Sequence, residues 1–85
     1  MTSKQTVYLL QRTAKPEERY VGITSNLKRR LAEHNSGRSP HTSKFRDWKL
    51  RAAIWFEDED RALDFERYLK TGSGRAFANR HFWCA

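Results

Sequence analysis

The chain has 85 residues, enough for one small domain with a compact core, and we expect residues 1–85 to form a single domain. Its 17 Lys and Arg residues outnumber the 10 Asp and Glu residues, and the resulting formal charge of +7 favours a polyanionic partner such as nucleic acid. A hydrophobic fraction of 38% beside a charged fraction of 32% excludes a membrane-embedded protein and an intrinsically disordered chain.

Charge alone leaves an alternative open, because many small basic proteins carry solvated Lys and Arg and bind no polyanion. The single cysteine, Cys84, excludes a disulfide framework and a Cys-based zinc site within this chain. No apolar run approaches the ~20 residues that span a bilayer, and the first residues have too short an apolar core for a signal peptide. We therefore expect a reducing, cytoplasmic location.

The first half of the chain predicts a hairpin followed by a helix. Residues 6–12 and 19–23 are short runs rich in β-branched and aromatic residues, and the polar segment 13–18 joins them, which is typical of an antiparallel hairpin. Residues 24–26 offer three helix-capping side chains before a basic helix over 27–37, whose last residue is a glycine placed to end it.

The second half predicts a strand and one or two helices. Residues 38–48 read as a loop, 49–57 as a strand and 58–74 as the clearest helix, with acidic residues at its start. Residues 72–74 (GSG) are interpreted as a helix stop and turn, because no strand precedes them as a nucleotide-binding fingerprint would require. Residues 75–83 are expected to form one short further helix. One face of the predicted strand collects Leu50, Ala52, Ile54 and Phe56.

The element order is therefore β-β-α-β-α, with a possible final helix. Hairpin-first order favours an α+β fold over a doubly wound parallel sheet. We expect a small three-stranded antiparallel sheet flanked by helices.

The basic helix turns charged residues toward the side that it should bury. Leu27, Arg30, Leu31 and His34 recur at spacings of three and four and so form one stripe. A structural explanation is available for both charged members: an arginine stem can cover apolar surface while its head reaches water, and a buried histidine can bond a backbone group. The functional alternative is that both side chains belong to a site.

The later helix shows a similar feature with the opposite charge. Ala62, Phe65 and Leu69 form its apolar stripe, and Glu66 lies at the rim of that stripe. Such a carboxylate usually pairs with a cation, and Lys70 is available four residues on. The alternative is a carboxylate that binds Mg²⁺ or Mn²⁺, which prefer oxygen ligands.

The hairpin carries Tyr8 on its first strand and Tyr20 on its second, with Gly22 two residues later. Core packing explains most strand tyrosines, and a strand glycine indicates a bend or a close approach of the backbone. Together with an arginine, a histidine and a glutamate, these residues could perform phosphodiester hydrolysis. Tyrosine or histidine can position or deprotonate water, arginine can hold phosphate, and a carboxylate-bound metal can neutralise the leaving oxygen.

This pattern resembles the GIY-YIG nuclease superfamily over residues 7–69. The similarity is greatest to its small stand-alone bacterial members and more distant to the N-terminal nuclease domain of UvrC. It is carried by VYLL (7–10), YVG (20–22), the basic helix NLKRRLAEHNSG (26–37) and the glutamate helix ALDFERYLK (62–70).

The resemblance implies a role for each matching residue. Tyr8 and Tyr20 would be the two motif tyrosines, one of which orients or activates the attacking water, and Gly22 would keep the backbone close to the site. Arg30 would contact the scissile phosphate, and His34 would assist proton transfer.

The resemblance also implies a single divalent cation, Mg²⁺ or Mn²⁺, held by Glu66. Asn79 is the candidate for an asparagine that some members carry after the glutamate helix. The chain departs from the first motif at Val7, where the family has a glycine.

The resemblance implies a metal-dependent endonuclease acting on DNA. One alternative is a nucleic-acid-binding module of the same fold that cuts little and is targeted by a partner protein. A weaker alternative is a basic domain that binds another protein. Core packing is expected for at least two of Phe45, Trp48 and Trp55, which could otherwise stack on bases. The predicted contacts to the DNA backbone are Arg29, Arg38, Lys44 and Arg46.

Overall fold

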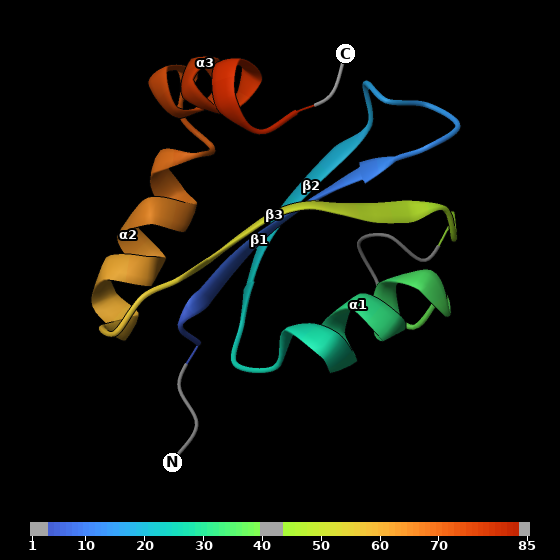
Figure 1. Ribbon diagram of the computed structural model, residues 1–85, viewed down its shortest axis with the longest axis horizontal. Helices are drawn as coiled ribbons and strands as arrows, with labels where there is room; N and C mark the ends of the chain where they lie inside the picture. Colours follow the sequence, from blue (N-terminus) through green and yellow to red (C-terminus); the bar gives the residue numbers. More distant parts are fainter. Residues whose placement is uncertain (1–3, 40–43, 84–85) are drawn as a thin grey trace.

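The computed structural model describes residues 4–39 and 44–83 and confirms the α+β architecture. Figure 1 shows a sheet with helices packed around it. In chain order the elements are β1 (Thr6–Arg12), β2 (Arg19–Thr24), α1 (Leu27–Asn35), β3 (Trp48–Trp55), α2 (Glu59–Tyr68) and α3 (Gly72–His81).

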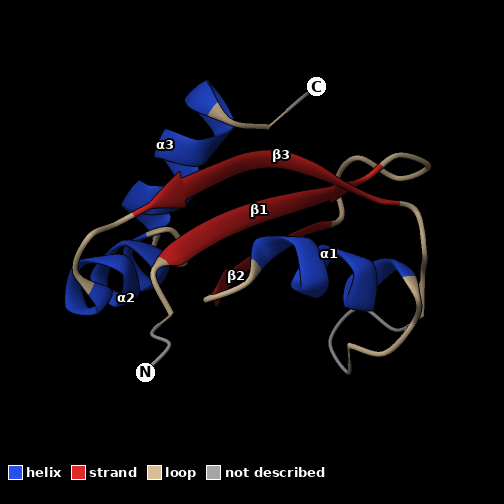
Figure 2. Cartoon of the chain, turned by 60° about the horizontal axis from the view of Figure 1, so that its bottom comes forward, coloured by secondary structure: helices blue, strands red, loops and turns tan. Residues whose placement is uncertain are grey.

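The sheet has the strand order β2-β1-β3, and both strand pairs are antiparallel. Helix α1 covers one face, and α2 and α3 lie on the other (Figure 2). Because β1 is central, it is buried on both sides: Val7 and Leu9 pack toward α2 and α3, whereas Tyr8 and Leu10 pack toward α1.

The apolar alternation predicted for β3 is interrupted by a bulge. Leu9 pairs with Ala52 and Leu10 pairs with Leu50, so Arg51 is an extra residue opposite no partner on β1. Leu50 therefore packs in the α1-side cluster, while Ala52 packs on the α2 side. The prediction that Leu50 shares the face of Ala52 is wrong, because an inserted residue reverses the order of the two faces.

Helix α1 begins at the predicted residue, Leu27, and ends at Asn35, two residues before the predicted end at Gly37. The Asn26 side chain accepts a hydrogen bond from the Arg29 amide at 3.1 Å, and Gly37 adopts the left-handed conformation with φ +81° after the last turn. The Asn35 amide then holds the helix to the sheet, since it donates to the Trp48 carbonyl and accepts from the Trp48 amide, each at 2.9 Å.

The predicted helix over residues 58–74 is two helices. Helix α2 ends at Tyr68, and residues 72–74 form the first turn of α3 rather than a stop. The physical reason is the Thr71 hydroxyl, which caps α3 by accepting a hydrogen bond from the Gly74 amide at 3.1 Å. A Cβ at Gly74 would lie 1.8 Å from the Tyr68 carbonyl oxygen, so the two helices meet with no room for a side chain.

An ion cluster joins the hairpin loop to the segment before β3. The guanidinium of Arg12 bonds Glu18 at 3.0 Å and Asp47 at 2.9 Å, and it lies 3.5 Å from the centre of the Phe45 ring. The Asp47 carboxylate also accepts from the Ala14 amide, and that bond together with Arg12 lowers the pKa of Asp47 to about 2. The cluster thus fixes both segments.

Within the described ranges, none of the helices has the length and apolar character needed to cross a membrane. Of the predicted loop over 38–48, residues 40–43 lie outside those ranges, as does Cys84.

Candidate active site

Three rings from three elements meet under α1. The Tyr8 hydroxyl and Nε2 of His34 lie 2.8 Å apart, and the His34 ring centre is 4.8 Å from that of Tyr20. His34 is fully buried, because the stripe of α1 that carries it faces the sheet. The predicted grouping of these residues is therefore present, and His34 hydrogen-bonds a side chain rather than only the backbone.

The hydroxyl of Tyr8 is neutral at physiological pH. Burial, and then the nearby Tyr20 hydroxyl, raise the pKa of Tyr8 to about 12, against a partly opposing effect of Arg30. A neutral hydroxyl can donate to His34 or accept from it, depending on the histidine tautomer. Tyr8 is thus suited to orient His34 rather than to act as a phenolate base.

Gly22 allows the tyrosine rings to lie across β2. It pairs directly with Tyr8 in the sheet, and a Cβ at Gly22 would lie 2.6 Å from Cζ and Oη of Tyr8 and 2.8 Å from Cε2 of Tyr20. The close approach predicted for this glycine is therefore an approach of two aromatic side chains to the backbone.

Arg30 projects from α1 beside the same cluster. Its guanidinium donates to Glu33 at 2.8 Å, which is the largest cause of a raised Arg30 pKa, and the nearby Tyr8 hydroxyl raises that pKa further. With its side chain 30% exposed, Arg30 retains access to solvent. It lines a hollow of about 330 Å³ together with Arg29, Glu33 and residues at the end of β2.

Glu66 lies on α2, against the opposite face of the sheet from α1. Its carboxylate forms an ion pair with Lys70, so the pairing that the i, i+4 spacing allowed is confirmed. The side chain of Glu66 is 14% exposed, and Lys70 reaches from it into the hollow that Tyr20 lines. Glu66 itself lines neither hollow, so the structure does not place it in the cluster of Tyr8, Tyr20 and His34 with which the sequence groups it.

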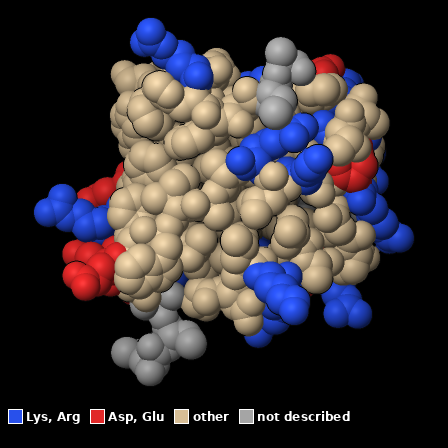
Figure 3. Space-filling model, viewed as in Figure 1, with Lys and Arg blue, Asp and Glu red and all other residues tan. Residues whose placement is uncertain are grey.

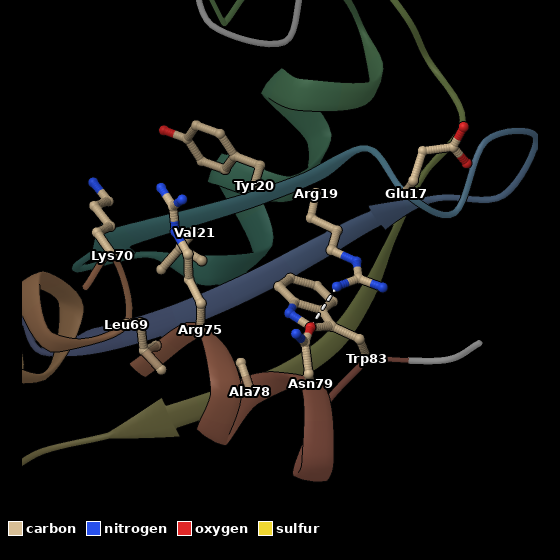
Figure 4. Close-up of a pocket in the computed structure, with 10 residues that line it drawn as sticks. All are labelled: Glu17, Arg19, Tyr20, Val21, Leu69, Lys70, Arg75, Ala78, Asn79 and Trp83. Carbon is tan, nitrogen blue, oxygen red and sulfur yellow. Dashed lines mark hydrogen bonds between the residues drawn. The ribbon is translucent and has the colours of Figure 1, made fainter. Parts of the chain in front are cut away.

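A wider hollow of about 490 Å³ opens between β2 and α3. Figure 4 shows Tyr20 at one end of it and Asn79 at the other, where Oδ1 of Asn79 accepts from Nη1 of Arg19 at 2.7 Å. Asn79, a candidate from the sequence, thus lies in the same hollow as Tyr20. Further lining residues are Glu17, Val21, Leu69, Lys70, Arg75, Ala78 and Trp83.

The predicted contacts to the DNA backbone occupy different places. Arg29 is exposed at the smaller hollow, whereas Arg38, Lys44 and Arg46 are exposed beyond the end of α1 and line neither hollow. Figure 3 shows acidic and basic side chains together at the left edge, over α2, and further acidic side chains among basic ones on the right of the viewed face.

The three aromatic residues considered for stacking differ in their burial. Trp48 is buried in the α1-side cluster, Phe45 is partly buried beneath the guanidinium of Arg12, and Trp55 is 65% exposed at the end of β3. Core packing is therefore confirmed for Trp48 and not for the other two.

Comparison with known proteins identifies the family. A family model described as the GIY-YIG catalytic domain matches residues 4–80. The chain belongs to the GIY-YIG family. A curated relative, the structure-specific endonuclease subunit SLX1 of the yeast Debaryomyces hansenii, is 38% identical over 71 residues, which covers 75% of this chain and 20% of the relative. The chain thus spans about a fifth of that relative's length. No solved structure matches.

The departure from the GIY-YIG motif at Val7 is accommodated in the core. Val7 is fully buried on β1, pairs with Ile23 and Ile54, and packs in the cluster under α2 and α3. Its side chain points to the face opposite Tyr8, so the valine adds apolar contact without entering the ring cluster.

Sequence reasoning missed Arg19 and Arg75 of the larger hollow, and it considered Lys70 only as the partner of Glu66. Arg75 and Asn79 are four residues apart and so share a helical face. That signal is available from the sequence only once α3 is known to begin at Gly72. Arg19 opens β2 and reaches back to α3, a pairing 60 residues apart along the chain that no local pattern indicates.

Glu66 is the carboxylate that the resemblance assigns to a divalent cation. No cluster of three or more His, Cys, Asp and Glu suited to a metal occurs among the residues that the structure describes. The donor set fits the type of Mg²⁺ site in which one or two carboxylates, water and substrate phosphate complete the coordination. Glu66 would be the protein ligand, once its pairing with Lys70 is released.

Proposed function

We propose that this GIY-YIG domain hydrolyses phosphodiester bonds of DNA with the help of a divalent cation, Mg²⁺ or Mn²⁺. The observation that carries the proposal is the buried contact between Tyr8 and His34, at 2.8 Å, beside Tyr20 and the guanidinium of Arg30. A tyrosine, a histidine and an arginine held together can supply proton transfer and phosphate binding, and Tyr20 and Arg30 each line a hollow beside them.

The exposure of the two tyrosines assigns them different parts. Tyr8 is 1% exposed and keeps its proton, so it orients His34. Tyr20 is half-buried and lines the hollow, where its hydroxyl can hold a water. In the proposed step that water attacks phosphorus, its proton passes to the Tyr20 oxygen, and the Tyr20 hydroxyl proton passes to His34. The P–O bond opposite the attacking oxygen breaks, and the leaving oxygen departs with the electron pair of that bond.

Arg30 and Glu66 complete the proposed site. The guanidinium of Arg30 binds a non-bridging oxygen of the scissile phosphate and stabilises the charge that develops on it. A divalent cation, when bound at Glu66, supplies charge neutralisation for the leaving oxygen. Gly22 keeps the backbone of β2 clear of the rings, and Arg29, Arg38, Lys44 and Arg46 bind more distant backbone phosphates.

A second candidate is a DNA-binding module that cuts only with a partner protein. It is favoured by the curated relative, whose name describes a subunit and of which this chain spans a fifth. Salt-sensitive DNA binding without metal-dependent cleavage on any substrate would support this candidate.

The test is a cleavage panel of linear and branched DNAs with Mg²⁺, with Mn²⁺ and with chelator. We expect metal-dependent nicking that falls by about 10²–10³-fold in Glu66→Ala and in Arg30→Ala, because each removes charge stabilisation from the reaction. Asp64→Ala is the matched control, since it removes an exposed carboxylate from the same helix. Unchanged cutting by Glu66→Ala would exclude the proposed metal ligand.

A further inference from the structure

The larger hollow contains arginine charge that the domain does not itself neutralise. Arg19 is held by three neutral partners: the Pro16 carbonyl at 3.2 Å, the Asn79 amide oxygen at 2.7 Å and the Trp83 ring at 5.1 Å. These contacts fix the guanidinium in place but leave its positive charge uncompensated.

Arg12 provides the contrast within the same molecule. It is buried between Glu18 and Asp47 and so has two carboxylates within 3.0 Å. Among the described residues, neither Arg19 nor Arg75 has a carboxylate within ion-pair distance, although both line one hollow. An arginine that is positioned yet unpaired is suited to bind an anion.

Arg75 approaches the hollow from the opposite wall. It is exposed on α3, and Figure 4 shows its guanidinium on the same side as the hydroxyl end of Tyr20 and the ammonium of Lys70. Lys70 is already paired with Glu66, and Glu17 is an exposed carboxylate at the rim near Arg19. The uncompensated charge of the hollow therefore comes from its two arginines.

The size of the hollow limits what can enter. A volume of about 490 Å³ lies within the range of sites that hold one small organic molecule, and it suits a nucleotide unit. The hollow therefore holds a single nucleotide unit rather than a whole duplex. A basic groove with an aromatic wall is the usual surface for a single strand.

We propose that Arg19 and Arg75 form a phosphate-binding subsite that holds an unpaired DNA strand on the α3 side of Tyr20. The subsite rests on the proposed nuclease function and deepens it, because it assigns an unpaired strand next to the scissile phosphate. Asn79 and Trp83 position Arg19 for this contact. The close contact between the backbones of Gly74 and Tyr68 holds α3 where Arg75 reaches the hollow.

The test is the salt dependence of binding to a short fluorescent single-stranded oligonucleotide, measured by anisotropy with chelator present so that no cleavage occurs. For Arg75→Ala and Arg19→Ala we expect about fivefold to tenfold weaker binding, with the slope of log K against log salt reduced by about 0.7 for each lost phosphate contact. Arg80→Ala, an exposed change on the same helix outside the hollow, should leave the slope unaltered.

Two comparisons keep the outcomes separate. A blunt duplex of the same sequence should lose less affinity than the single strand in Arg75→Ala, and equal losses would overturn the assignment of an unpaired strand. If Arg19→Ala and Arg75→Ala both bind like Arg80→Ala, the proposal of a subsite is wrong, even if the wild type cleaves DNA. If the wild type cleaves nothing while the variants lose single-strand binding, the nuclease proposal fails and the subsite stands. Thermal unfolding of Arg19→Ala shows whether its weaker binding results from a destabilised fold. If it does, the binding of Arg75→Ala, a change at an exposed residue, decides whether the subsite exists.

Discussion

Because Gly22 has no side chain, the rings of Tyr8 and Tyr20 can both lie close to its backbone. A methyl group at this position would meet both rings at 2.6–2.8 Å, and Tyr8 cannot move aside freely because it is 1% exposed. The glycine therefore sets the position of Tyr8 against His34, on which the proposed proton transfer depends.

We expect Gly22→Ala to lower the cleavage rate by about 10- to 100-fold, because a shift of roughly 1 Å in positioned groups costs that much. Overpacking should also lower the free energy of unfolding by about 1–3 kcal/mol. Single-turnover cleavage and urea unfolding measure the two effects. Wild-type activity in the folded variant would show that the rings need no such clearance.

At the scale of residues, the sequence predicts much of the site because two simple periods describe it. The helical spacing of Arg30 and His34 and the hairpin pairing of Tyr8 place these three side chains on one face with Tyr20. The contact of Arg19 with Asn79 depends instead on how α3 packs, which no local period contains.

Among the elements, the junction of α2 and α3 is where sequence reasoning fails. Two glycines in three residues predict a stop, yet the Thr71 cap and the close contact of Gly74 start a new helix at once. Glycine here serves packing between helices rather than chain reversal. The bulge in β3 is missed for a related reason, since one inserted residue leaves no compositional trace.

The two glycines of this junction make a matched pair of substitutions. Gly74→Ala should lower the free energy of unfolding by at least about 2 kcal/mol, because its Cβ would lie 1.8 Å from a backbone oxygen. Gly72→Ala should leave stability unchanged or raise it by up to about 1 kcal/mol, since nothing lies within 4 Å of its Cβ and the unfolded chain loses freedom. Urea unfolding of both variants tests this, and equal midpoints would contradict it.

For the whole molecule, stability at low pH depends on the ion cluster around Arg12. The pKa of Asp47 is about 2 in the fold against an ordinary value of 3.8, so its ionised form is favoured by folding. The stabilisation is fully present above the ordinary value, and it is lost as the pH falls from about 4 toward 2.

Asp47→Asn should therefore lower the unfolding midpoint at pH 7 and make little difference near pH 2, where the wild-type carboxylate becomes protonated. Thermal unfolding of both proteins across this pH range measures the difference. Asp64→Asn is the control, because its carboxylate is 75% exposed and lies 3.9 Å from Arg67 in a solvent-screened ion pair. A constant gap between Asp47→Asn and wild type from pH 7 to pH 2 would contradict the assignment.

The bulge at Arg51 also bears on how this chain behaves at high concentration. Strand β3 forms one border of the sheet, and a regular strand there would offer its unpaired backbone groups to another copy. The extra residue breaks that regularity, and its guanidinium folds back onto Gln11 at 2.8 Å, so a charged side chain accompanies the irregular backbone. The irregular pairing of β3 with β1 is therefore expected to hinder β3 from pairing with strands of other copies, and so to limit aggregation.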